Sequence, residues 1–170
     1  MTIEDLLAKQ EIYELSCSYM RGLDRLDGDL QKTVFHREAT VDYGFFQGSG
    51  SEFVEFAQRV LKSHAANHHM LGQVDIKVDG ERATGEVYFQ AYHRVVENDV
   101  PIDLFIAGRY LDRYAKDQGV WKILFRQEIN DWASRHPASE GTSLSAPALR
   151  GARRPEDASY GMQSSLSVRD

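Results

Sequence analysis

The sequence predicts an α+β domain in which helices come first and a mainly antiparallel sheet follows. Apolar residues recur every three or four positions from residue 3 to residue 22, which is the period of an amphipathic helix. Beyond Asn67, long runs rich in β-branched and aromatic residues are separated by short segments containing Gly, Pro, Asn or Asp, as in strands joined by turns. The length of 170 residues suits one domain with a continuous core. Helices followed by a curled sheet form an α+β layer arrangement.

The first helix is predicted over residues 3–22. Thr2 followed by Asp5 is typical of a helix start, because each side chain can bond the other's backbone N–H. The single cysteine, Cys17, cannot form an internal disulfide and falls within this amphipathic pattern. We expect it to be a small core residue, since free cysteines are often buried.

A second, short helix is predicted from Gly28 to Phe35, with Asp24 in the corner between the two helices. Asp27 is the better candidate for the cap of this second helix. The run "ATVDYGFFQG" that follows has the β-branched and aromatic residues of a strand. Ser51 is then the expected cap of a third helix reading EFVEFAQRVLKSH.

The sheet is expected from four long runs, QVDIKV, TGEVYFQAYHRVV, IDLFIAGRYLDRYA and VWKILFRQEINDWA. The turns between them read DGER, ENDVP and KDQG. After Trp132 the composition becomes rich in Ser, Ala, Gly, Pro and Arg, so we divide the chain into a folded domain, residues 1–135, and a loosely structured extension, residues 136–170. Four apolar or aromatic residues of the extension are candidate anchors onto the domain or a neighbouring subunit: Leu144, Leu149, Tyr160 and Met162.

Composition and charge argue against several partner classes. Apolar residues make up 42% and charged residues 27%, as in ordinary globular proteins. A net charge of -6 without a Lys/Arg-rich run argues against nucleic acid or an anionic membrane as partner. The acidic N-terminus is unlike a signal peptide, and no apolar run reaches membrane-spanning length, so we expect a cytoplasmic protein.

Neither a nucleotide cofactor nor any other cofactor is expected. The "GSGSE" segment precedes a helix but lacks the Lys-Ser/Thr of a phosphate-binding loop. The sheet carries many apolar and aromatic residues, including Phe89, Phe105, Tyr110 and Trp121, which are typical of a core or a subunit contact. An apolar outer face favours self-association, and we expect a homodimer or homotrimer.

The order of elements and three local strings resemble the SnoaL-like branch of the nuclear transport factor 2-like superfamily. The strings are "YMRGLDRLDGDL", "HHMLGQVDIKVDGERATGEVYF" and "GVWKILFRQEINDW", and the resemblance spans residues 3 to about 133. The branch contains bile acid 7α-dehydratase, scytalone dehydratase and hexachlorocyclohexane dehydrochlorinase. The resemblance implies a cone-shaped α+β barrel, with three N-terminal helices packed in the concave side of a curved sheet.

In the dehydratase branch, an aspartate after the first helix pairs with a histidine at the start of a sheet strand. Asp24 matches the aspartate and His69 the histidine. His68 does not match, and neighbouring strand residues face opposite sides of a sheet. A neutral imidazole can remove a proton near pH 7, and a carboxylate on its far nitrogen fixes the tautomer and stabilises the imidazolium. We therefore expect His69 as the general base and Asp24 as its orienting group.

Four more residues are candidates for the site through the same resemblance. Tyr19 and Tyr43 match tyrosines of bile acid 7α-dehydratase, and we expect Tyr19 in the catalytic set and Tyr43 at the substrate, as hydrogen-bond donors to a leaving oxygen. That enzyme has an arginine in the last strand where this chain has Asn130, a departure from the pattern. Arg126, four residues earlier on the same strand face, is the candidate that supplies the cation, so Arg126 and Asn130 complete the expected substrate contacts.

The remaining histidines do not predict a metal site. His64, His68 and His69 lie within six residues, but the helical pattern fades near Asn67 and no acidic ligand is close in sequence. His36 and His93 are expected at the surface or at a sheet edge, and His136 at the start of the extension.

The residues favour a cofactor-independent lyase that removes a proton from a hydrophobic, ring-containing small molecule with loss of water. Three alternatives stay open. One is an isomerase or cyclase using the same dyad. Another is a non-catalytic member that binds an apolar ligand or builds an oligomer. A third is the small subunit of a ring-hydroxylating dioxygenase, because one fold hosts many functions.

Overall fold

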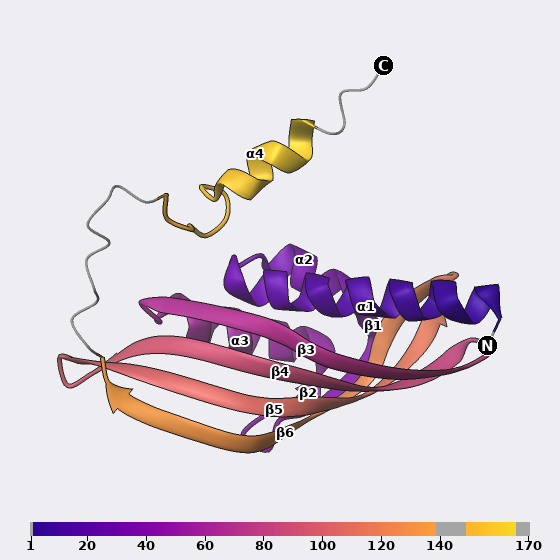
Figure 1. The fold of residues 1–170 in the computed structure, drawn as a ribbon, viewed down its shortest axis with the longest axis horizontal. Coiled ribbons are helices and arrows are strands. Elements are labelled where there is room, and N and C mark those ends of the chain that lie inside the picture. Colours follow the sequence, from indigo (N-terminus) through magenta and orange to yellow (C-terminus); the bar gives the residue numbers. More distant parts are fainter. Residues whose placement is uncertain (1, 139–148, 166–170) are drawn as a thin grey trace.

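The computed structural model describes residues 2–138 and 149–165. Helices and strands follow in the order α1 (Ile3–Asp24), α2 (Gly28–Thr33), β1 (Phe35–Asp42), β2 (Gln47–Ser49), α3 (Gly50–Lys62), β3 (Ala66–Asp79), β4 (Arg82–Glu97), β5 (Val100–Asp117), β6 (Val120–Pro137) and α4 (Ala158–Ser165) (Figure 1). The predicted fold class is confirmed, because the helices α1 to α3 lie on a curved sheet.

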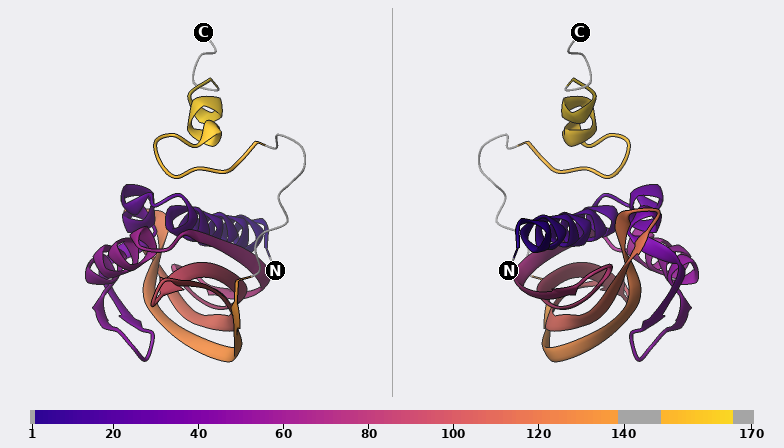
Figure 2. Two further views of the ribbon diagram at one scale, coloured as in Figure 1. Left: turned by 90° about the vertical axis from the view of Figure 1, so that its left-hand side faces the viewer. Right: turned by 90° about the vertical axis from the view of Figure 1, so that its right-hand side faces the viewer.

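The sheet has six strands in the order β2-β1-β6-β5-β4-β3. The pairing of β1 with β6 is parallel, and the other neighbouring strands are antiparallel. Seen from its ends, the sheet curls strongly without closing, and α1 lies across the opening (Figure 2). Long strands that twist in one direction produce such a curl.

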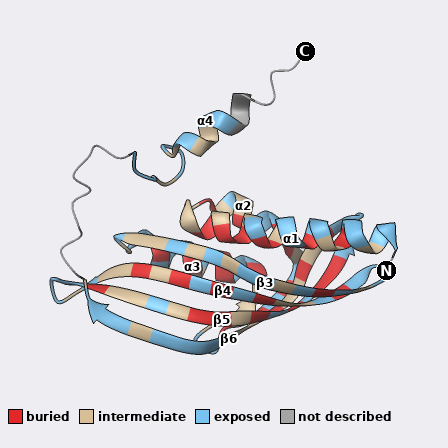
Figure 3. Ribbon diagram, in the orientation of Figure 1, coloured by how far each residue is buried: buried red, intermediate tan, exposed pale blue. Residues whose placement is uncertain are grey.

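The core lies between the helices and the concave face of the sheet, and the outward face of α1 is exposed (Figure 3). Along α1 the buried residues recur at helical spacing, at Ala8, Ile12, Ser16, Tyr19, Met20 and Leu23. Cys17 lies next to Ser16 on the exposed side of this helix, so the expectation of a buried cysteine was wrong.

Helix α1 continues through Gly22 to Asp24, two residues beyond the predicted end. A side chain at Gly22 would place its Cβ 2.8 Å from the Cβ of Gln31, so this glycine allows α1 and α2 to approach closely rather than ending the helix. Asp27 caps α2 as predicted, accepting a hydrogen bond from the backbone N–H of Leu30. Helix α2 ends at Thr33, two residues earlier than expected.

The cap of α3 is Ser49, and the expectation of Ser51 was wrong. Ser49 and Glu52 form a capping box, in which each side chain bonds the other's backbone N–H. This arrangement satisfies two helix N–H groups at once, whereas Ser51 lies inside the helix.

An extra residue in β6 changes which side chains face the core. Arg113 pairs with Phe125 and Tyr114 with Ile123, so Leu124 is bulged out of the pairing. Before the bulge the odd-numbered residues of β6 face inward, and from the bulge to Asn130, where the register shifts again, the even-numbered residues do.

The described part of the C-terminal extension contacts the corner between α1 and α2. Strand β6 runs to Pro137, beyond the expected boundary at residue 135, and α4 follows residues 149–157. The Tyr160 hydroxyl donates to Asp27, and Arg154 forms ion pairs with Asp27 and Asp29. Of the other expected anchors, Leu149 and Met162 are exposed, and Leu144 lies outside the described residues. None of the helices in residues 2–138 and 149–165 is both long and apolar enough to cross a membrane.

Candidate active site

Asp24 and His69 are in direct contact. Asp24 is the last residue of α1, and His69 lies near the start of β3, which packs beside that helix. The His69 ring nitrogen Nδ1 is 2.7 Å from Asp24 Oδ1, and the His69 backbone N–H donates to both carboxylate oxygens at 3.0 and 3.1 Å. The Asp24 side chain is 10% exposed and the His69 side chain is 7% exposed. This arrangement holds the carboxylate against Nδ1 of His69, so Nε2 is the ring nitrogen that remains for another partner.

His68 and His69 face opposite sides of the sheet, as strand alternation predicts. The His68 side chain is 63% exposed, and its Nδ1 is 3.8 Å from Asp24 Oδ2, beyond hydrogen-bond length. Asn67 instead donates to Asp24 Oδ1 at 3.1 Å, while its own amide oxygen accepts a bond from Arg153 of the C-terminal extension. The carboxylate is therefore held by Asn67 and His69 together.

His69 lines a cavity of about 470 Å³ between the helices and the sheet. Aromatic and aliphatic side chains from α1, α3, β4 and β5 form most of its wall, including Phe53, Phe56, Phe89, Leu104 and Ile106. Phe45 and Asn130 belong to the lining and are exposed, so the cavity opens to solvent at these residues. Its size and apolar wall suit a small hydrophobic molecule.

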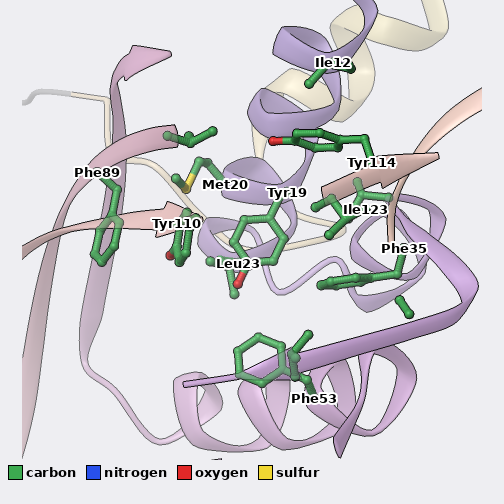
Figure 4. Packing of buried hydrophobic residues seen from close by; sticks show 14 of the residues in the cluster. Ile12, Tyr19, Met20, Leu23, Phe35, Phe53, Phe89, Tyr110, Tyr114 and Ile123 are labelled. Atoms are coloured by element: carbon green, nitrogen blue, oxygen red, sulfur yellow. The ribbon is translucent and has the colours of Figure 1, made fainter. Parts of the chain in front are cut away.

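Tyr19 and Tyr43 meet at the inner end of the cavity. Their hydroxyl oxygens are 2.7 Å apart, and both residues line the cavity. Figure 4 shows Tyr19 between Tyr110 and Phe35, and the Tyr43 ring stacks on Phe53 at 3.9 Å. Burial raises the pKa of Tyr19 and raises that of Tyr43 well above the ordinary value. Both phenols are therefore protonated at neutral pH and able to donate a hydrogen bond.

The structure places Arg126 outside the cavity lining. Its side chain is fully buried, and its guanidinium donates to both carboxylate oxygens of Asp112 at 2.8 and 2.7 Å. The same guanidinium lies 4.2 Å from the centre of the Tyr19 ring and 4.0 Å from that of Tyr110. Burial acts to lower the pKa of Arg126, but Asp112 outweighs it and holds the group cationic. The geometry thus gives this arginine structural partners in place of the expected substrate contact.

Glu128 is a cavity residue that the sequence reading missed. It follows Arg126 by two positions on β6, on the same inward face, and lines the cavity with Asn130. Burial raises its pKa to about 7, against the opposing effects of a hydrogen bond from Asn130 and the charge of Arg126. An acidic residue inside an apolar-rich strand is a sequence signal for such a group, but it gives no direction for the side chain.

His93 also differs from its expectation, because it is buried and lines the cavity. Its ring lies 5.1 Å from that of His69, and its Nδ1 is 3.2 Å from His64 Nδ1. Burial, together with the neighbouring His69 and His64, lowers the pKa of His93 to about 3. A neutral His93 places no positive charge beside His69 at neutral pH. No group of three or more acidic, cysteine or histidine residues in the described ranges has the arrangement of a metal site.

These features define a small α+β domain with a polar dyad in an apolar cavity, and comparison of the sequence identifies its family. The model of the SnoaL-like domain family matches residues 4–127. The chain therefore belongs to this family, and the resemblance drawn from its motifs is confirmed.

The relatives agree with this assignment. An uncharacterised protein of Mycobacterium tuberculosis strain H37Rv is 26% identical over 132 residues, which cover 75% of this chain and 88% of the relative. The structure of hexachlorocyclohexane dehydrochlorinase LinA type 2 superposes with a TM-score of 0.72 at 18% identity, covering 86% of this chain and 99% of that one. A candidate scytalone dehydratase from Novosphingobium aromaticivorans gives 0.71 at 19% identity, covering 93% of this chain and 99% of that one. At these identities the two structures show the fold alone.

Proposed function

We propose that this protein is a cofactor-independent lyase that eliminates water from a hydrophobic, ring-containing small molecule. The observation that carries the proposal is the 2.7 Å contact between Asp24 and His69 at the wall of a solvent-reached apolar cavity. Elimination from a carbon next to a leaving group needs a positioned base, and a neutral imidazole performs this near pH 7. The names of two structural neighbours, a dehydrochlorinase and a candidate dehydratase, belong to the same class of reaction.

In this mechanism Nε2 of His69 takes a proton from the substrate carbon. The electron pair of the broken C–H bond forms the double bond, and the C–O bond breaks with its pair remaining on oxygen. Asp24 holds the proton on Nδ1, which keeps Nε2 as the acceptor, and it stabilises the imidazolium that forms. Asn67 supports this by holding Asp24 in place.

Tyr19 and Tyr43 bind a substrate oxygen in this proposal. Since one hydroxyl of the pair donates to the other, the second hydroxyl proton is available to the cavity. A phenol with a raised pKa is a good donor to a substrate carbonyl or hydroxyl but a poor source of a full proton. In the same proposal Asn130, which lines the cavity near its opening, contacts a polar group of the substrate.

The test compares two adjacent histidines. Purified protein is incubated with cyclic β-hydroxy ketones of the terpenoid, steroid and polyketide classes, and formation of the conjugated enone is followed by absorbance and by mass. His69→Gln should lower turnover by about 10²-fold or more, whereas His68→Gln, which changes an exposed ring on the same strand, should leave it unchanged. Equal turnover by the wild type and His69→Gln on every converted substrate would remove His69 from the mechanism.

A further inference from the structure

Glu128 stands out among the acidic residues because it lines the cavity without forming an ion pair. Asp24 is held by His69 and Asn67, and Asp112 by Arg126. Within residues 2–138 and 149–165, the Glu128 carboxyl takes part in no ion pair. Burial of this carboxyl group in an apolar cavity favours its protonated form and outweighs the opposing charge of Arg126.

Glu128 lies on another wall of the cavity than His69. His69 is on β3 and Glu128 on β6, with β4 and β5 between them. Through the strand pairing, His69 aligns with Ala133 on β6 rather than with Glu128, so the two residues are offset along the strands as well as separated by three strand spacings of about 4.8 Å. The sheet curls, and both residues line the same cavity on its concave side.

We propose that Glu128 is the catalytic acid that protonates the departing hydroxyl of the substrate. This inference rests on the elimination proposed above. As His69 Nε2 takes the carbon-bound proton, the Glu128 O–H gives its proton to the leaving oxygen, and the products are an alkene and one water molecule. The imidazolium and the Glu128 carboxylate then return to their starting forms by proton exchange with solvent through the opening at Asn130, so atoms and charges balance.

The protonation state of Glu128 matches the role of an acid. With a pKa of about 7, a substantial fraction of Glu128 carries its proton at neutral pH, and this fraction falls as the pH rises. An acid whose pKa lies near the working pH combines a high protonated fraction with a strong driving force for proton transfer.

The first test measures Glu128 directly and needs no substrate. Protein labelled with ¹³C at the glutamate side-chain carboxyl is titrated by NMR, and the Glu128 resonance is assigned by its loss in Glu128→Gln. We expect a midpoint near pH 7 for this group, compared with about 4.3 for an ordinary glutamate. A midpoint near the ordinary value would overturn the inference.

The second test uses the pH profile of turnover on a converted substrate. In the wild type kcat/KM should fall above about pH 7, because the acid loses its proton. Glu128→Gln should lower kcat by about 10²-fold or more and remove this basic limb, whereas Glu128→Asp should keep a basic limb at reduced kcat. Glu86→Gln, which alters a carboxylate paired with Arg109 elsewhere on the sheet, is the matched control and should leave the profile unchanged.

The outcomes distinguish this inference from the proposed function. If His69→Gln retains activity while Glu128→Gln loses activity and the basic limb, the assigned base is wrong and the acid role of Glu128 stands. If Glu128→Gln keeps both the basic limb and its turnover, Glu128 is not the acid, whatever the result for His69.

Discussion

The buried pair of Arg126 and Asp112 allows a quantitative test of the core without any substrate. We consider Asp112→Asn, which keeps the shape of the side chain and removes its charge. Both side chains are fully buried, and Asp112 also accepts a hydrogen bond from the Tyr114 hydroxyl at 2.7 Å. The substitution leaves the guanidinium without a counter-charge and turns an amide NH₂ toward one of its donors. Breaking a buried pair from one side costs about 3–5 kcal/mol, a large part of the roughly 5–15 kcal/mol that stabilises a typical domain.

Urea denaturation followed by tryptophan fluorescence measures this loss. With a slope of about 2 kcal/mol per molar urea, the midpoint should fall by roughly 1.5–2.5 M. Asp131→Asn is the control, because Asp131 pairs with Arg109 at a 40% exposed position and such pairs contribute about 1 kcal/mol or less. The double variant Arg126→Met/Asp112→Leu should recover most of the lost stability, since it leaves no unpaired charge. Equal losses for Asp112→Asn and Asp131→Asn would refute the assignment of Arg126 as a structural cation.

Three further predictions concern the site and the helix corner. Asp24→Asn should keep an amide oxygen against Nδ1 of His69, because Asn67 and the His69 backbone N–H also donate to that position. It removes the negative charge that stabilises the imidazolium, so turnover should fall by about 10²-fold or more; unchanged turnover would contradict the role of Asp24. His93 has a lowered pKa of about 3 in the folded protein. Below about pH 6.5 the unfolded chain therefore binds a proton that the folded protein does not. As the pH decreases from 6.5 to 5, the free energy of unfolding should decrease by about 2 kcal/mol. His93→Phe should remove that component, and parallel stability profiles of wild type and variant would disprove it. Gly22→Ala should cost about 1–3 kcal/mol by thermal unfolding, because its Cβ would approach that of Gln31 to 2.8 Å; a neutral effect would show that α2 shifts freely.

Much of the fold follows from local patterns in the sequence. The helix caps at Thr2 and Asp27 are short-range arrangements of side chain and backbone, so three or four residues are enough to predict them. The opposite directions of His68 and His69 follow from the period of two in an extended strand. The pairing of Asp24 with His69 could be expected only through the resemblance, because 45 residues separate the two.

What the sequence could not predict depends on contacts between distant segments. Arg126 and Asn130 lie on one face of β6, as expected. That Arg126 forms an ion pair depends on Asp112, which comes from the neighbouring strand β5. His93 lies in a strand whose alternation gives its face, while its burial depends on α3 and His64. The burial of Cys17 was predicted wrongly, because the spacing of apolar residues shows where the buried stripe of a helix runs but not how wide it is.

The bulged residue Leu124 has a consequence for how this fold changes its chemistry over evolution. Trp121 and Ile123 before it, and Glu128 and Asn130 after it, face inward together only because one additional residue separates the two series. Deleting a single codon there would turn one series outward, so that the chain would lose either two core residues or the polar wall of its cavity. Gaining or losing one residue at such a point exchanges a whole set of cavity side chains in one event, without point substitutions at any of them.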